Sequence, residues 1–182
     1  MIKMKRLKIT LISVLIAVGI NPLYAELIGP ELGQDVTPEE IAKWDISVFP
    51  DGEGLPKGQG NAEQGEKVYQ QQCISCHGQG GLGTVAGDQL AGAQMGLTSK
   101  YPEQTIGTYW PYATTVFDVI RRSMPMTAPG SLSNNDVYAV TAYLLYLNNI
   151  IEKDDVMNDS TLAKVKMPNE DGFINSFEVG VN

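Results

Sequence analysis

The stretch Cys73-Ile74-Ser75-Cys76-His77 decides how the rest of this sequence is interpreted. The chain has two cysteines and one histidine among its 182 residues, and all three fall within these five positions. Cys-x-x-Cys-His is the pattern of covalent haem attachment, in which two thioethers hold the porphyrin edge and the following imidazole binds the iron. We therefore predict one covalent haem c on Cys73 and Cys76, with His77 as an axial ligand.

Other uses of two cysteines fit this pattern less well. Two cysteines and one histidine supply three ligands, so a four-ligand zinc site would have to recruit a carboxylate, and the chain has no second Cys-x-x-Cys. A thioredoxin-like redox pair would follow a strand in a βαβ context, which the sequence lacks. A simple disulfide would not explain the adjacent histidine.

The second axial ligand has to be another residue type, because His77 is the only histidine. Methionine sulfur is the usual partner of histidine in cytochromes c. We favour Met124, which precedes Pro125 and lies between a long loop and the last helix. The alternatives, in order of preference, are Met126 and then Met95 or Met167. With both axial positions taken, the iron would carry single electrons and offer no place for a substrate.

A group of aromatic and basic residues is the next candidate for haem contacts. Trp110 or Tyr109 could donate a hydrogen bond to a haem propionate, and Arg121 or Arg122 could pair with its charge. We assign the propionates to Trp110 and Arg121. The alternative is that the aromatic residues only pack and the arginines are solvated.

The N-terminal segment is predicted to be a secretory signal peptide, residues 1–25. It begins with four basic residues, continues with an apolar run that is too short for the roughly 20 residues a membrane span needs, and ends in Leu23-Tyr24-Ala25. An uncleaved anchor is the alternative. Cleavage would place the chain in the periplasm, with no membrane attachment, and would change its formal charge from −8 to −12, because the segment has no acidic residue. Such a surface repels nucleic acid, so we expect protein partners.

Apolar spacing and capping residues predict a helical domain with an irregular strap on either side. The four predicted helices begin at Thr37 with Pro38, at Asn61 with Gln64, near Tyr112, and at Ser133 with Asp136. The expected segments are an N-terminal strap 26–60, a core 61–150 with a long loop at 78–107, and a C-terminal strap 151–182, with helices at 37–45, 61–72, 112–122 and 134–149.

These residues resemble those of class I cytochromes c. The resemblance rests on Gly65 and Tyr69 in the helix before Cys-x-x-Cys-His, on the late Met124-Pro125, and on Ala142-Tyr143-Leu144 in the last helix. It implies an all-α fold around one covalent haem, in which the first and last core helices cross where Gly65 meets Tyr143.

A narrower resemblance covers most of the mature chain. The matching stretches resemble the cytochrome subunits of periplasmic molybdenum sulfite dehydrogenases and of the Sox sulfane dehydrogenase. This resemblance implies that the chain accepts electrons from a molybdopterin enzyme that oxidises a sulfur compound, and passes them one at a time to a downstream redox protein. The stretches include Trp44-Asp45-Ile46, Pro50-Asp51-Gly52, Gly54-Leu55-Pro56, 106–115, Arg121-Arg122-Ser123-Met124-Pro125, 128–132 and 167–173.

Two other functions stay open at this point. The haem could itself be catalytic on a small sulfur compound or peroxide, which would need an open or displaceable axial position. The chain could also be a general-purpose respiratory cytochrome. We expect an electron-transfer protein and no catalytic residue of its own.

Overall fold

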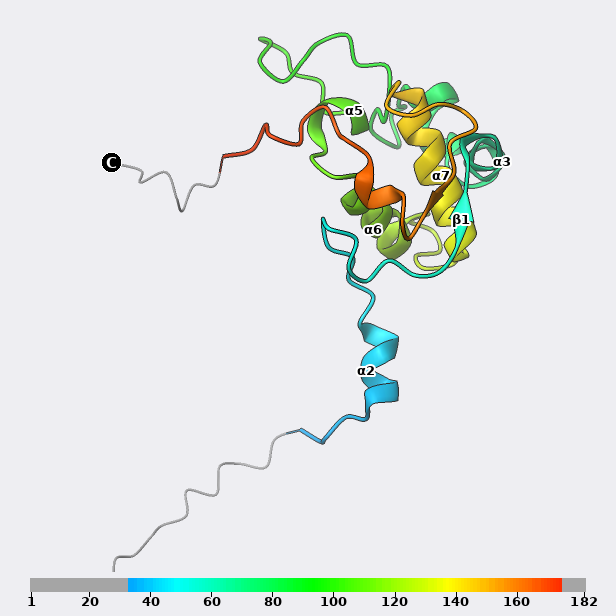
Figure 1. Cartoon of the computed structure of the whole chain (residues 1–182). Coiled ribbons are helices and arrows are strands. Elements are labelled where there is room, and N and C mark those ends of the chain that lie inside the picture. The colour runs from blue at the N-terminus through cyan, green and yellow to red at the C-terminus, as the bar shows by residue number, and fades with distance from the viewer. Residues whose placement is uncertain (1–32, 175–182) are drawn as a thin grey trace, which may run out of the picture. The chain divides into compact units, whose positions relative to one another are not determined.

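The computed structural model describes residues 33–174, and the predicted signal peptide lies outside them. Within this range no helix is both long enough and apolar enough to span a membrane. The elements in chain order (Figure 1) are α2 (Pro38–Trp44), β1 (Gln59–Gly60), α3 (Ala62–Gln72), α4 (Ile74–His77), the 3₁₀ turn η1 (Gln79–Gly81), α5 (Ile106–Tyr109), α6 (Ala113–Ser123), α7 (Asn134–Leu147), β2 (Met157–Asn158) and the 3₁₀ turn η2 (Leu162–Lys164).

The helices begin where the capping residues predict. The Asn61 side chain accepts from the Gln64 N–H while Gln64 bonds back to the Asn61 N–H, and Ser133 and Asp136 make the same reciprocal pair. Each pair satisfies backbone donors that the first turn of a helix leaves free. Thr37 caps α2 in the same way through Glu40, although α2 buries none of its residues. The four predicted helices are confirmed to within two residues.

The core is built on the crossing of α3 and α7. A Cβ added to Gly65 would lie 1.8 Å from the Ala139 carbonyl oxygen and 2.8 Å from the Tyr143 Cβ, so the two backbones meet where glycine leaves room. One turn further along α3, the Tyr69 ring packs 5.3 Å from the Tyr143 ring, measured between centroids. The predicted contact between Gly65 and Tyr143 is confirmed.

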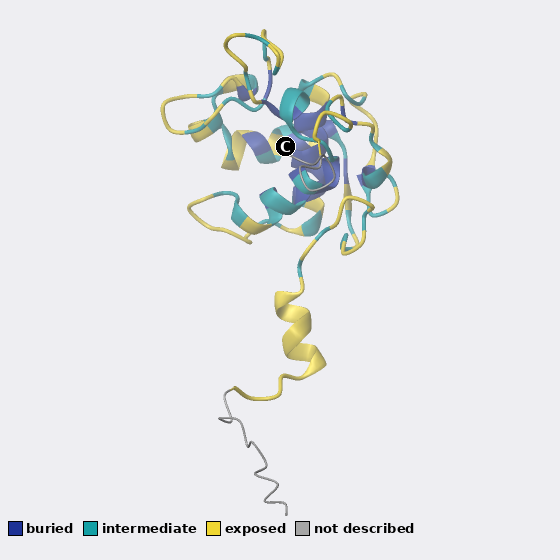
Figure 2. Cartoon of the chain, turned by 90° about the vertical axis from the view of Figure 1, so that its left-hand side faces the viewer, coloured by how far each residue is buried: buried dark blue, intermediate teal, exposed yellow. Residues whose placement is uncertain are grey.

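Helix α7 is the central element, and Figure 2 shows it buried along most of its length. Its other side packs against α6, where the Phe117 and Tyr138 rings lie 4.5 Å apart between centroids. The Tyr138 hydroxyl donates to the Pro56 carbonyl at 2.9 Å, which ties the segment before β1 onto α7. The architecture is all-α, as predicted.

The segment 46–60 is hydrogen-bonded to the surface of α6. Its Val48 N–H donates to the Asp118 carboxylate of α6 at 3.1 Å, and its Pro50 carbonyl accepts from the Thr114 hydroxyl at 3.3 Å. It ends in β1, which pairs antiparallel with β2 so that Gln59 faces Asn158. Sequence reasoning did not predict this two-stranded ladder, because two residues are too few for a strand pattern.

The C-terminal segment is more deeply packed than its polar sequence suggests. Met157, Leu162 and Met167 are buried in the same core as α6 and α7. The Asn169 side chain donates to the Tyr109 carbonyl at 2.7 Å, and Phe173 packs edge-on against the Tyr109 ring. Met157, Leu162 and Met167 are spaced five residues apart, which is neither the helix nor the strand period. The sequence therefore gave no sign that this segment is buried.

Candidate functional site

The Cys-x-x-Cys-His motif lies at the end of α3 and in the single turn of α4. Cys73 ends α3 by donating its N–H to the Tyr69 carbonyl at 2.9 Å, and the His77 N–H bonds back to the Cys73 carbonyl at 2.9 Å. The Tyr69 hydroxyl donates to the Gly78 carbonyl at 2.8 Å just beyond the motif. Two thiols and one imidazole are thus held on a single helical turn that is anchored in the core.

A loop spanning residues 82–88 wraps this turn. The Gly83 N–H donates to the His77 carbonyl at 2.8 Å, and the Thr84 hydroxyl donates to the Cys76 carbonyl at 2.5 Å. A Cβ on Gly87 would lie 2.9 Å from the same Cys76 oxygen, so this position also needs the smallest residue. The loop therefore orients the backbone carbonyl groups of the motif and leaves its two thiols available for haem attachment.

The His77 ring is oriented by this loop. Its Nδ1 lies 2.8 Å from the Asp88 carbonyl oxygen. A carbonyl can only accept, so Nδ1 is the donor in this contact, and Nε2 is the ring nitrogen left to bind a metal. A backbone carbonyl on the far nitrogen is the usual way in which a protein orients a metal-binding imidazole.

The donor set fits a covalently attached haem. Cys73 and Cys76 form no disulfide with each other, and residues 33–174 contain no cluster of acidic, histidine and cysteine side chains able to hold a metal ion. Burial raises the pKa of the Cys73 thiol to about 11, with a smaller effect from Cys76. Two unpaired thiols beside an imidazole with a free Nε2 are what thioether attachment and iron ligation require.

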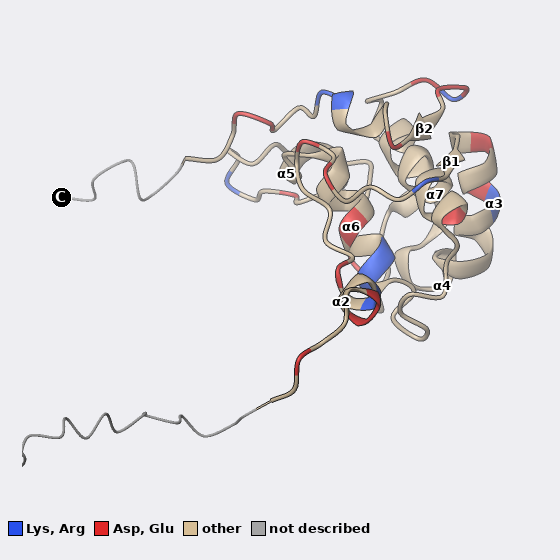
Figure 3. Ribbon diagram, turned by 60° about the horizontal axis from the view of Figure 1, so that its bottom comes forward, with Lys and Arg blue, Asp and Glu red and all other residues tan. Residues whose placement is uncertain are grey.

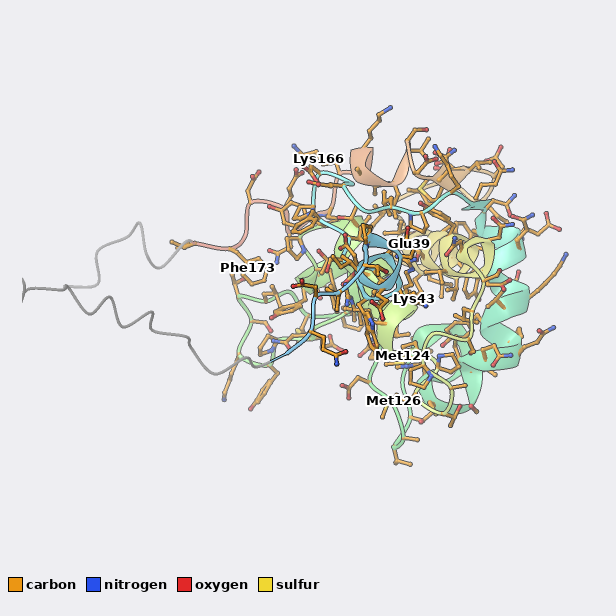
Figure 4. All side chains as sticks on the ribbon, turned by 90° about the horizontal axis from the view of Figure 1, so that it is seen from below. Glu39, Lys43, Met124, Met126, Lys166 and Phe173 are labelled. Atoms are coloured by element: carbon orange, nitrogen blue, oxygen red, sulfur yellow. The ribbon has the colours of Figure 1, made fainter. Side chains whose placement is uncertain are left out.

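The methionines differ sharply in burial. Met126 is 78% exposed and Met95 is 48% exposed, whereas Met167 is 2% exposed and packs inside the core. Met124 is half-buried against the core at the end of α6, with its N–H bonded to the Ile120 carbonyl and an extended backbone at φ −117° and ψ 144°. Figure 4 shows Met126 beyond Met124 and farther from α6. Met124 combines partial burial with a fixed backbone.

The candidate propionate residues lie on different elements. Trp110 follows α5 and packs partly against the core, and its indole N–H has no hydrogen-bond partner within residues 33–174. Arg121 donates to the Ile46 carbonyl at 3.2 Å. Arg122 bonds the Asp118 carboxylate at 2.7 Å and the Ser47 hydroxyl at 3.0 Å. Both arginines are therefore hydrogen-bonded to the N-terminal strap, a contact that the sequence alone could not predict. Arg121 uses one of its guanidinium N–H groups in this bond and keeps the others as possible donors.

Comparison with known proteins identifies the family. The family model for cytochrome c matches residues 62–148. A chain of the sulfane dehydrogenase SoxCD from Paracoccus pantotrophus is 40% identical, with a TM-score of 0.77, over 84% of this chain and 76% of that chain. The chain belongs to the cytochrome c family. Membership implies covalent haem c, and the fold and resemblance predicted from the sequence are confirmed.

Thiosulfate dehydrogenase from Stutzerimonas stutzeri (strain A1501) is a more distant relative. It is 30% identical over 89 residues, which are 49% of this cytochrome and 28% of that protein. The matched region is thus less than a third of the relative's length. The SoxCD match, by contrast, extends well beyond residues 62–148 into the flanking segments.

Proposed function

We propose that this cytochrome is an exported, periplasmic carrier of single electrons with one haem, held by Cys73 and Cys76 and ligated by His77 and Met124. It accepts electrons from a molybdopterin enzyme that oxidises a sulfur compound, and delivers them to a downstream redox protein. Trp110 and Arg121 contact the haem propionates. The chain has no catalytic residue of its own.

The observation that carries the proposal is the geometry of His77. Its ring is held through Nδ1 by the Asp88 carbonyl, directly after two unpaired thiols. A haem bound there supplies an iron that takes up and releases one electron. The protein's part would be to hold the His77 imidazole in one orientation and to supply the Met124 sulfur as the second ligand, so that the iron would keep the same ligands in both oxidation states.

The burial pattern favours Met124 as that second ligand. A sulfur that binds iron has to be fixed in place and shielded from water, which argues against the exposed Met126 and Met95. Met167 is already packed among apolar side chains, where it fills space. The half-buried position of Met124, at the end of α6, meets both requirements.

The ligand assignment is tested with two matched variants of the holoprotein. Met124→Ala should abolish the weak near-infrared band of methionine-to-iron ligation in the ferric protein and lower the reduction potential. Met126→Ala, two residues away, should leave both unchanged. If the band survives in Met124→Ala and disappears in Met126→Ala, the ligand assignment is wrong.

The sulfur-oxidising context rests on the extent of the similarity to SoxCD. That match spans the straps as well as the helical core, and straps are where a carrier dedicated to one enzyme can differ from other cytochromes. The test is stopped-flow reduction of the ferric protein by a purified molybdenum sulfite or sulfane dehydrogenase with its substrate. Reduction only by unrelated respiratory donors would favour a general-purpose cytochrome instead.

A second candidate function is catalysis at the haem, which the similarity to thiosulfate dehydrogenase favours. It requires an axial position that a substrate can enter. Rapid binding of cyanide or carbon monoxide at neutral pH, together with turnover of thiosulfate without any partner protein, would support it. Slow binding and no turnover are expected of the carrier.

A further inference from the structure

The side chain of Asn148, the residue that ends α7, is hydrogen-bonded to its own helix and to two distant segments. Its Nδ2 donates to the Leu90 carbonyl at 3.1 Å and to the Leu144 carbonyl at 2.8 Å, and its Oδ1 accepts from the Gly107 N–H at 3.1 Å. The amide fits in this orientation alone, because carbonyls only accept and an N–H only donates. Asn148 therefore joins the end of α7 to the start of α5 and to the segment that contains Leu90.

Leu90 lies close in the chain to the carbonyl that orients His77. Asp88 precedes Leu90 by two residues, and its carbonyl oxygen lies 2.8 Å from the His77 Nδ1. Asp88 is itself exposed, so packing does not fix it, whereas Leu90 is partly buried against the core. The position of the Asp88 carbonyl therefore depends on how firmly Leu90 is held.

Leu90 is held through both of its backbone polar groups. Its N–H donates to the Gly81 carbonyl at 2.7 Å, and its carbonyl accepts from the Ile106 N–H at 3.0 Å in addition to the Asn148 amide. Of these three hydrogen bonds, the one from Asn148 is the only one that a side chain makes. It is therefore the bond that depends on the type of residue present.

The junction around Asn148 is closely fitted and uncharged. A Cβ added to Gly107 would lie 2.7 Å from the Asn148 Oδ1, so a larger residue there would displace the amide. No Lys, Arg, Asp or Glu belongs to α4 or α5, and α7 carries only Asp136, in its first turn and far along the helix from Asn148 (Figure 3). Neutral hydrogen bonds, rather than ion pairs, therefore hold these segments together.

We propose that Asn148 is a positioning residue for His77. By holding Leu90, it keeps the Asp88 carbonyl on the Nδ1 of the imidazole. A hydrogen bond to the far nitrogen of a metal-binding histidine raises the basicity of the ligand, and a more basic ligand favours ferric over ferrous iron. The proposal rests on one part of the function proposed above, that His77 binds the haem iron, and needs neither Met124 nor a particular electron donor.

The test compares two variants of the holoprotein, Asn148→Leu and Asn61→Ala. Leucine keeps the branched shape of asparagine but has no donor or acceptor. Asn61→Ala is the control, because it removes a capping bond at the end of α3 opposite Cys73 and touches nothing near His77. Comparison of the two separates an effect on His77 from a general loss of stability.

Asn148→Leu should raise the reduction potential, whereas Asn61→Ala should leave it unchanged. In the reduced protein, followed by proton NMR, the His77 Nδ1–H should exchange with solvent at least about tenfold faster in Asn148→Leu than in Asn61→Ala, because its acceptor is no longer held in place. If the two variants gave the same potential and the same exchange rate, the effect would follow from stability alone and the proposal would be overturned.

A second variant keeps the test decisive if Asn148→Leu does not fold. Asn148→Ala removes the same hydrogen bonds without adding bulk, so it should move the potential and the exchange rate in the same direction. An Nδ1–H exchange rate in Asn148→Ala within about twofold of the wild type, with an unchanged potential, would equally overturn the proposal.

The wild type separates failure of this proposal from failure of the proposed function. In the reduced wild type, His77 ring protons shifted strongly upfield by the haem would show that His77 is an axial ligand. Their absence would refute the ligand assignment and this proposal together. If the shifts are present and the Asn148 variants behave as Asn61→Ala does, the proposed function stands and the role of Asn148 is refuted.

Discussion

The crossing of α3 and α7 should not tolerate even one methyl group at Gly65. In Gly65→Ala the new Cβ would lie 1.8 Å from the Ala139 carbonyl oxygen and 2.4 Å from its carbonyl carbon, both backbone atoms of α7. The helices would have to separate by more than about 1 Å, and a packed interior resists such a shift. The separation would also loosen the packing of Tyr69 on Tyr143.

The size of the effect follows from two opposing contributions. Overpacking a core costs about 1–3 kcal/mol, and here the obstructing atoms cannot rotate away. Replacing glycine by alanine inside a helix gains about 1 kcal/mol. Because the clash is with backbone, we expect the upper end of the cost or beyond, and a net loss of about 2–3 kcal/mol in the free energy of unfolding.

The assay is guanidinium unfolding of the holoprotein, followed by circular dichroism at 222 nm. A loss of this size lowers the midpoint by roughly 0.5–1 M for a domain of ordinary slope. Gln70→Ala, on an exposed position of the same helix, is the control and should shift it little. An unchanged or higher midpoint for Gly65→Ala would refute the close crossing, because only the gain in helix propensity would then remain.

Two further predictions concern the capping of α3 and the buried tyrosines. Asn61→Ala should lower the free energy of unfolding by about 1 kcal/mol, because the Gln64 N–H loses its acceptor, and thermal unfolding checks this against Gln70→Ala. Burial is the main cause that raises the pKa of Tyr69 and of Tyr138 to about 12. The folded state binds the two phenol protons more tightly than the unfolded chain does. The contribution of these tyrosines to the free energy of unfolding is therefore complete below about pH 10 and is lost as the pH rises towards 12. Unfolding temperatures measured from pH 8 to 12 should fall less steeply in Tyr138→Phe than in the wild type, and equal slopes would contradict this assignment.

Local sequence was sufficient for the helices of the core. The capping pairs at Asn61 and Ser133 determine where α3 and α7 begin, because the hydrogen bonds involved span only three residues. The haem-attachment motif is equally local. The short ladder between β1 and β2 was beyond prediction, since each strand is stabilised by a partner about a hundred residues away.

The candidate site also combines features that are local in sequence with features that only the fold creates. Cys73, Cys76 and His77 are identifiable as neighbours in a motif, but the bond that orients the His77 ring comes from a backbone carbonyl, which has no residue-specific signal. Sequence could rank the methionines only by context, whereas burial separates Met124 from the exposed Met126. The hydrogen bonds of Arg121 and Arg122 to the strap were likewise invisible.

By itself, the sequence predicted the haem-attachment chemistry and determined the helical class and the starts of the core helices, because each depends on residues a few positions apart. The tertiary structure alone decided which side chains are covered and which remain exposed. It brought the Asp88 carbonyl to His77, buried Met167 in the core, and left Val85 and Met126 uncovered. Burial is a property of distant segments packed together, and no local pattern encodes it.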